Sequence, residues 1–451
     1  MSEWIDAETR VRRAHRLYEQ GRWVEAAAEL SAAIDVNPIN PSWHFNLGVT
    51  FEAMEDYARA CEAFRKVVKI DPRDVEAMNC LGVNMTRLGQ YTEALKQFER
   101  VQKVSPKYEP SYCNRIVTYT EMGDFENAEL MFYLARQIKP NCPLCYYNIG
   151  NTLFGQGLYE RAIDCWRQTL KFDADHPDAN IRIAEAYWAM GNLNEARRHY
   201  QLELTMGNED VDSLLDYGEL LAEMGQADEA QRIFNRALDK EYDNPSVHYC
   251  IGELAMSRGN LVQAEEEFHI VLELDDDYSG AHMRLGEVLL KRNMLKNAAK
   301  NLIIELKRSS DDPEMLRELA GLLQQASRLR ESNIALQRLV ELKPDDADAH
   351  HELAVSCFMM DKYGEGIRSC RRALKLRNNF APALYNLALA YHKLNRPKRA
   401  KRFASRALTA SPNEPQIRNL CRHLGLWSLR RIVGSWCRRA LKKTRALTRA
   451  R

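Results

Sequence analysis

Small residues recur along this chain in two series that share one spacing. Steps of 34 residues from Gly48 meet Gly or Ala almost every time: Ala14, Gly48, Gly82, Ile116, Gly150, Ala184, Gly218, Gly252, Gly286, Ala320, Ala354 and Ala388. A second series, 12 residues later, is small throughout: Ala26, Ala60, Ala94, Ala128, Ala162, Ala196, Ala230, Ala264, Ala298, Ser332, Gly366 and Ala400. The constant phase predicts two helices per repeat, packed closely where these residues meet.

The residues between and after these series predict how the helices end. The first helix is followed by types that tolerate the left-handed conformation: Gly21, Gly89, Gly123, Gly157, Gly191, Gly225, Gly259, Asn293, Asp361 and Asn395. Prolines close the second helix at Pro38, Pro72, Pro106, Pro140, Pro344 and Pro412. From Ala174 to Ser310 these prolines are absent, and Glu203 and Glu305 replace small or apolar residues. We expect looser packing there.

The spacing resembles that of the tetratricopeptide repeat family, with Leu-Gly, Tyr, Ala, Phe and Pro at the same offsets, as in Leu47, Gly48, Tyr57, Ala60 and Phe64. The resemblance covers twelve repeats over residues 7–414, after a lead-in at residues 1–6. It implies an all-α, right-handed superhelical solenoid whose first helices line a concave groove. It also implies a non-enzymatic scaffold or adaptor that binds a protein or peptide in that groove.

Asparagines at the sixth position of the repeat are candidate groove residues. They are Asn46, Asn114, Asn148 and Asn386. An amide side chain can bond both the N–H and the C=O of an extended peptide, so such a ladder would bind backbone whatever the peptide's sequence. The alternative is that Asn is simply common beside Leu-Gly in these repeats.

Glutamates occupy the ninth position of four consecutive repeats, at Glu185, Glu219, Glu253 and Glu287, with Asp216 close by at a sixth position. If these side chains face the groove, they form an acidic stripe that attracts a basic ligand. The alternative is a solvated helix face on which Arg182 and Arg284 are local ion-pair partners.

The 11 cysteines are too sparse for a disulfide scaffold in a chain of 451 residues, so reduced thiols are expected. Cys142 and Cys145 form a C-x-x-C sequence near a helix start that could lower a thiol pKa. A structural zinc needs four ligands, no second pair has suitable spacing, and His176 is expected about 10 Å away. We therefore predict inert thiols and no metal or cofactor, with redox or metal chemistry as the alternative.

The composition limits the possible functions. Apolar residues make up 45% and charged residues 28%, no stretch of 18 apolar residues occurs, and the charged start is unlike a signal peptide. These features predict a cytoplasmic protein. No Gly-rich phosphate loop, nucleophile elbow or kinase signature is present, so no enzyme activity is expected.

The last part of the chain differs in charge. Residues 415–451 hold 11 Lys and Arg and no acid, which leaves a net charge of −10 on residues 1–414. Residues 415–424 are expected to form a helix that caps the last repeat, and residues 425–451 a basic amphipathic helix. The tail residues proposed to bind are Arg430, Arg431, Trp436, Arg438, Arg439, Lys442 and Lys443.

Several partners suit such a tail. It can lie on an anionic membrane, dock on a partner, pack on the capping helix, or bind the acidic stripe within one molecule or between copies. Nucleic acid is the partner class not expected. The alternative function is accordingly a membrane-associated assembly factor, peripherally bound through the tail.

Overall fold

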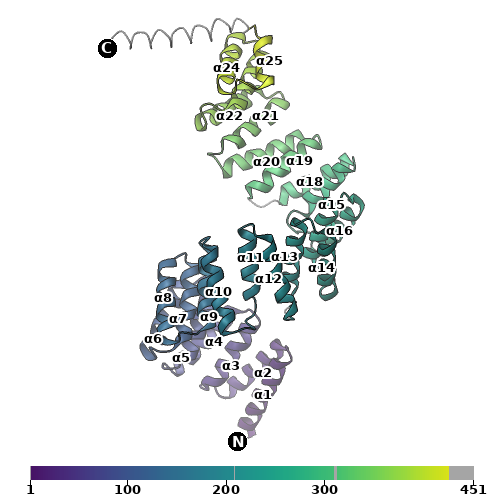
Figure 1. Cartoon of the computed structure of the whole chain (residues 1–451). Coiled ribbons are helices and arrows are strands. Elements are labelled where there is room, and N and C mark those ends of the chain that lie inside the picture. Colours follow the sequence, from purple (N-terminus) through teal and green to yellow (C-terminus); the bar gives the residue numbers. More distant parts are fainter. Residues whose placement is uncertain (1, 208, 309–311, 426–451) are drawn as a thin grey trace, which may run out of the picture. The chain divides into compact units, whose positions relative to one another are not determined.

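A computed structural model describes residues 2–207, 209–308 and 312–425, and these residues form helices joined by short loops (Figure 1). They divide into two compact units, Met1–Gln226 and Ala227–Arg451. The boundary falls between α13 and α14, the two helices expected to form the seventh repeat. The predicted all-α repeat fold is confirmed.

The first unit contains α1 (Ser2–Glu19), α2 (Trp23–Val36), α3 (Pro41–Ala53), α4 (Tyr57–Ile70), α5 (Val75–Arg87), α6 (Tyr91–Val104), α7 (Glu109–Glu121), α8 (Phe125–Ile138), α9 (Pro143–Gly155), α10 (Tyr159–Phe172), α11 (Ala179–Ala189), α12 (Leu193–Thr205) and α13 (Val211–Glu223). The second contains α14 (Ala227–Lys240), α15 (Pro245–Ser257), α16 (Leu261–Leu274), α17 (Ala281–Lys291), α18 (Leu295–Arg308), α19 (Pro313–Gln325), α20 (Leu329–Leu342), α21 (Ala347–Met359), α22 (Tyr363–Leu376), α23 (Ala381–Lys393), α24 (Pro397–Ala410) and α25 (Pro415–His423). Helix α1 begins at Ser2, within the expected lead-in.

A residue in the left-handed conformation ends each first helix, as predicted. All the glycines, asparagines and the aspartate named for this position have φ between 55° and 75°. Glu55 and Ser327 complete the series with φ of 57° and 60°, although neither residue type favours this conformation. The turn geometry is therefore set by the packing of the two helices and not by the loop residue alone.

The first small series packs differently from the prediction. A Cβ added to Gly82 would lie 2.6 Å from the Phe98 ring, and one added to Gly150 would overlap Trp166 Nε1. The closest neighbours of these glycines are therefore large side chains of the second helix, not the alanines of the second series. Phe98 and Trp166 are fully buried, so each glycine makes room for an aromatic ring in the core of its hairpin.

Gly150→Ala is expected to destabilise the first unit by about 1–2 kcal/mol. Trp166 cannot move away easily, because its Nε1 donates to Tyr147 O and Asn151 Oδ1, both at 3.2 Å. The overpacking therefore outweighs the better helix propensity of Ala. Gly321→Ala is the matched control, since an added Cβ there meets nothing within 4 Å. Thermal unfolding should show a small gain for Gly321→Ala. A gain for both variants would contradict the assigned packing.

Glu305 was expected to loosen its repeat, but the structure shows the opposite. Its side chain is 3% exposed, and its carboxylate accepts hydrogen bonds from Gly280 N at 3.1 Å and Met283 N at 3.2 Å. Gly280 has φ of 84°, and α17 begins one residue later. The buried carboxylate thus satisfies backbone donors at the start of α17. Glu203 holds the same repeat position as Glu305 and is 1% exposed. The residue before α11, Asp178, likewise has a positive φ, of 65°.

Polar side chains also connect consecutive repeats. The fourth residue of several first helices bonds a carbonyl in the loop after the preceding second helix: His44 to Pro38 O at 2.9 Å, Tyr112 to Pro106 O at 2.9 Å, His248 to Tyr242 O at 3.1 Å and His350 to Pro344 O at 3.0 Å. Arg418, the fourth residue of α25, makes the same bond to Pro412 O at 2.7 Å. Helix α25 therefore packs against α24 as a further first helix would.

The apolar face of α25 consists of Ile417, Leu420, Cys421 and Leu424, each at most 8% exposed. These residues belong to one core with α23 and α24, so the last hairpin does not present its apolar side to solvent. None of the helices among the described residues combines the length and apolar character needed to cross a bilayer.

Candidate functional site

Within each unit, first helices of consecutive repeats contact one another directly. This holds for α5 with α7, α7 with α9 and α9 with α11 in the first unit, and for α17 with α19 and α21 with α23 in the second. A hollow of 360 Å³ opens on this face between α1 and α3, lined by residues that include Val11, Tyr18, Asn46 and Val49. These first helices therefore lie side by side on one face of their unit. We call it the first-helix face.

The candidate asparagines divide into one exposed residue and three that bond the preceding repeat. Asn46 is exposed in the hollow. Asn114 Nδ2 donates to Asn79 Oδ1 at 3.1 Å, Asn148 Nδ2 donates to Cys113 O at 3.2 Å, and Asn386 Nδ2 lies 2.8 Å from His351 Nε2. Asn148 is only 8% exposed. These three amides join repeats, so one hydrogen bond of each is made within the chain and not to a peptide.

The acidic residues of the first unit lie close together on α11 and α13. Burial and the nearby carboxylates of Glu185 and Glu219 together raise the pKa of Asp216 to about 6. Arg182 donates to Glu185 at 2.9 Å, whereas no ion pair of Asp216 occurs among the residues that the structure describes. The partly buried carboxylate of Asp216 therefore faces like charges.

The corresponding acids of the second unit are paired with one arginine. Arg284 on α17 lies 3.0 Å from Glu253 on α15 and 3.0 Å from Glu287 on its own helix, and it also contacts Glu318 on α19. Glu287 has Lys291 as a further partner at 3.0 Å. Three consecutive first helices are thus joined by one guanidinium, and the negative charge of these positions is largely compensated.

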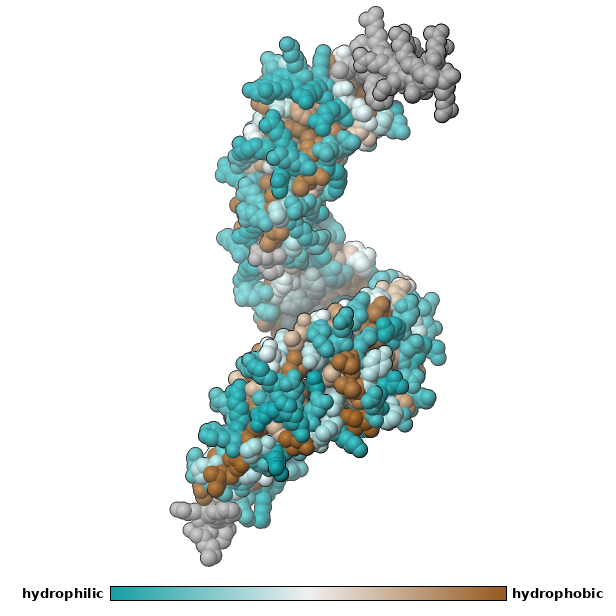
Figure 2. Space-filling model, turned by 90° about the vertical axis from the view of Figure 1, so that its left-hand side faces the viewer, coloured by the Kyte–Doolittle hydropathy of each residue, from teal (hydrophilic) through white to brown (hydrophobic). Residues whose placement is uncertain are grey.

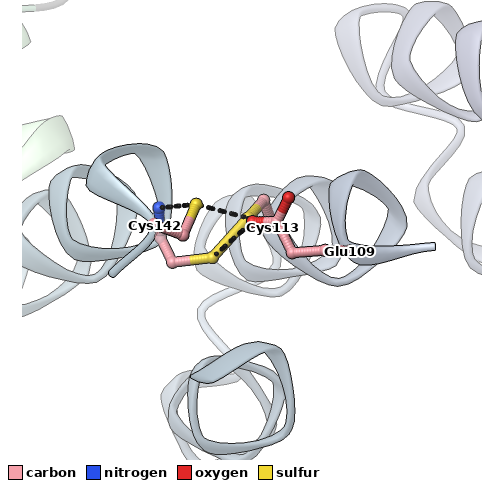
Figure 3. Close-up of side chains that lie close together, drawn as sticks. Glu109, Cys113 and Cys142 are labelled. Atoms are coloured by element: carbon pink, nitrogen blue, oxygen red, sulfur yellow. Dashed lines mark hydrogen bonds between the residues drawn. A yellow bond between two sulfur atoms is a disulfide. The ribbon is translucent and has the colours of Figure 1, made fainter. Parts of the chain in front are cut away.

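Four potential metal ligands meet at the junction of the fourth and fifth repeats (Figure 3). Glu109 begins α7 and Cys113 follows one turn later, while Cys142 precedes α9 and Cys145 lies in its first turn. Cys113 and Cys145 form a disulfide, which corrects the expectation that all thiols are reduced. We call these residues the Cys/Glu cluster; it does not include His176.

Cys142 remains a thiol in this cluster, and its pKa is not lowered in the way that a nearby helix start could lower it. Burial and, to a smaller extent, the neighbouring Glu109 raise its pKa to about 11. The bond that its sulfur accepts from Cys145 N at 3.4 Å acts in the opposite direction but is outweighed. Proximity to a helix start therefore does not make this cysteine a reactive thiolate at neutral pH.

The surface around these sites is mostly polar. On the face drawn in Figure 2, hydrophilic residues cover most of the surface, and apolar residues show as separate patches. A partner that binds such a face meets polar groups throughout. The tail residues Arg430, Arg431, Trp436, Arg438, Arg439, Lys442 and Lys443 lie outside the described residues.

The architecture defines the class of the protein: an array of helical hairpins with one recurring set of packing positions. Sequence comparison identifies the family within this class. Models described as tetratricopeptide repeat match residues 11–75, 215–279 and 358–424, one described as TPR repeat matches 150–191, and one described as YpiA-like, C-terminal tetratricopeptide repeats matches 177–244. The chain belongs to the tetratricopeptide repeat family. No curated protein matches its sequence.

Solved structures with similar folds have low sequence identity to this chain. YrrB, described as a TPR protein with an unusual peptide-binding site, is 19% identical, with coverage of 42% of this chain and 97% of its own and a TM-score of 0.38. Yeast Tom70 is 14% identical, with coverage of 94% and 96% and a TM-score of 0.40. TTC0263, a thermophilic TPR protein of Thermus thermophilus, is 21% identical, with coverage of 40% and 99% and a TM-score of 0.36.

Proposed function

We propose that this protein is a non-enzymatic scaffold that binds a basic segment of a protein partner on the first-helix face of its first unit. The observation that carries the proposal is the carboxylate group of Asp216, which is partly buried beside Glu185 and Glu219. Such an arrangement costs free energy in the free protein, because burial and like charges both oppose ionisation. A bound cation would offset that cost.

The acidic residues of the second unit differ from those of the first in their ion-pair partners, and this difference supports the assignment. Its acids at equivalent repeat positions, Glu253 and Glu287, already have Arg284 as a partner. In the first unit Arg182 pairs with Glu185; its charge also acts on Asp216, but Asp216 forms no direct ion pair among the described residues. Perturbed carboxylates of this kind are concentrated at functional sites. The first unit is therefore the better candidate for a cationic ligand.

A double variant, Asp216→Asn with Glu219→Gln, is expected to bind a basic peptide about five- to tenfold more weakly than the parent. Loss of two carboxylates removes roughly 1 kcal/mol or more of electrostatic attraction. The probe is a fluorescein-labelled peptide of alternating Lys and Ser, with binding followed by anisotropy at low salt. A Glu and Ser peptide of equal length should not bind, and added salt should weaken the Lys peptide.

The matched control is Glu93→Gln with Glu99→Gln, two exposed residues of α6 that lower the negative charge equally. Its affinity should stay within about twofold of the parent, since distant exposed charges act weakly. Equal losses in the two double variants would mean that net charge alone attracts the peptide, and would contradict the site. Capture of partners by the parent but not by the first variant would then identify the natural ligand.

The basic composition of residues 415–451 favours a second candidate function, membrane association. A polybasic segment with apolar residues at helical spacing binds anionic lipid through both features. Flotation with phosphatidylserine vesicles, with and without residues 426–451, distinguishes membrane association from peptide binding on the first-helix face. Dependence of flotation on those residues would support it, and their irrelevance would exclude the tail as the anchor.

A further inference from the structure

The Cys/Glu cluster is assembled from two consecutive repeats by the contact between α7 and α9. Glu109 and Cys113 come from α7, and Cys142 and Cys145 from the start of α9 (Figure 3). The Cα atoms of Cys113 and Cys145 are 5.3 Å apart. One potential ligand atom of each of the four side chains lies within 4.8 Å of all the others. The repeat packing thus holds three sulfurs and a carboxylate around one point.

The cluster lies at the edge of an apolar core. Cys113 and Cys145 are 0% exposed and Cys142 is 3% exposed, and their neighbours in that core include Ile116 and Ile149. Glu109 makes no ion pair with a basic residue in the described part of the chain. Glu109 is itself only partly buried, and a cation or hydrogen-bond donors would stabilise its carboxylate beside this apolar core.

The position of the Glu109 carboxylate is not explained by the disulfide. Its Oε1 lies 2.8 Å from Cys113 Sγ and 3.1 Å from Cys145 Sγ. These are hydrogen-bond distances, yet the sulfurs of a disulfide carry no proton to donate. Either reduced thiols or a cation bound between the carboxylate and the sulfurs would account for the close approach. The arrangement therefore suits the reduced cluster better than the oxidised one.

One sulfur–sulfur distance in the cluster matches a tetrahedral zinc site. A Zn–S bond of about 2.3 Å places two sulfur ligands about 3.8 Å apart, and oxygen ligands bind at about 2.0–2.2 Å. Cys113 Sγ and Cys142 Sγ are 3.9 Å apart. The N–H of Cys145 already donates to Cys142 Sγ, as backbone donors do to ligating sulfurs. Separation of the two bonded sulfurs and a small rotation of Glu109 complete the geometry.

We propose that the reduced Cys/Glu cluster binds one Zn²⁺ through Glu109, Cys113, Cys142 and Cys145, and so joins the fourth and fifth repeats. This site is independent of the peptide-binding proposal. A dithiol reductant supplies two electrons and two protons to the Cys113–Cys145 bond and is itself oxidised to a disulfide. Zn²⁺ then replaces the three thiol protons, which pass to the buffer. Oxidation and metal binding exclude each other at this junction.

The test is a titration of the full-length reduced protein with Co²⁺ under anaerobic conditions. One equivalent should produce thiolate-to-cobalt charge-transfer absorption and the visible bands of tetrahedral Co²⁺, and Zn²⁺ should abolish both. Cys142→Ser, which retains both cysteines of the disulfide, should bind Co²⁺ at least about a hundredfold more weakly. Cys61→Ser, a buried cysteine of α4, is the matched control and should bind as the parent does.

A second measurement needs no variant. In the reduced parent, Zn²⁺ should slow the alkylation of Cys113, Cys142 and Cys145, mapped by mass spectrometry, and leave the partly exposed Cys80 and Cys165 unaffected. Absence of the cobalt bands and of this protection in reduced, fully helical protein would overturn the proposal. Parental Co²⁺ affinity in Cys142→Ser would overturn it as well, because the cluster would then lack its third sulfur.

Discussion

Glu305→Ala should destabilise the α17–α18 hairpin by about 3–5 kcal/mol. The substitution removes the acceptor of two charge-assisted hydrogen bonds from Gly280 N and Met283 N. It also leaves both donors buried without a partner and opens a cavity in a region where Glu305 is 3% exposed. Each unsatisfied donor costs about 1–3 kcal/mol, and cavity formation adds to that cost.

The loss is expected to be local, because each repeat contacts mainly its neighbours and such arrays do not unfold as one unit. Hydrogen exchange followed by mass spectrometry should therefore show faster exchange in α17 and α18, with little change in α1–α6. Glu305→Gln keeps one acceptor and should lie between the variant and the parent. The exposed Glu99→Ala should have almost no effect. If Glu305→Ala exchanged like Glu99→Ala, the carboxylate would not be stabilising α17.

The role of Glu305 illustrates where sequence reasoning about this fold succeeds and fails. The two series of small residues and the recurrent glycines predicted the helical hairpins, because packing constraints repeat at every step. Glu305 stands where other repeats have a small or apolar residue, so the sequence predicted looser packing there. The compensating change is the left-handed conformation of Gly280, which delays the start of α17. The repeat pattern shows both departures, but it does not show that one compensates for the other.

The left-handed turns show the same limit at single residues. Glycines and asparagines predicted most of these positions. Glu55 and Ser327 adopt the same conformation, although their residue types do not favour it. For these two residues, the position in the 34-residue repeat predicts the left-handed conformation, and the residue type does not. In a repeat protein, the neighbouring repeats thus predict local backbone better than the local residues do.

The candidate sites depend on side-chain contacts between repeats, which the sequence predicted less well. Asn148 occupies the expected position but is buried by its bond to Cys113 O. Cys113 was overlooked as a neighbour of Cys145 because the two are 32 residues apart and do not share a repeat position. A search for Cys, His and acidic residues within two or three positions of the repeat spacing would have found the cluster.

Asp216→Asn is expected to stabilise the first unit by about 1–2 kcal/mol at pH 7.5, because solvent around the partly exposed carboxyl group screens part of the effect. The ordinary pKa of an aspartate is 3.8, and burial followed by repulsion from Glu185 and Glu219 raises that of Asp216 to about 6 in the folded state. One pKa unit corresponds to about 1.4 kcal/mol. Because the folded state binds the proton more tightly, ionisation of Asp216 lowers the free energy of unfolding as pH rises from about 4 to 6. Above pH 6 the full cost is present.

The pH dependence separates this cause from a simple packing effect. Asn resembles the protonated carboxyl group, so the gain in melting temperature should be clear at pH 7.5 and mostly lost at pH 4. Asp239→Asn, at an exposed position of α14, should leave the melting temperature nearly unchanged at both values. A gain of the same size at pH 4 and pH 7.5 would mean that Asn improves packing and that Asp216 is not strained by its charge. In that case the physical reason to place a cationic ligand beside α11 and α13 would also be lost, because the free protein would have no electrostatic cost for such a ligand to offset.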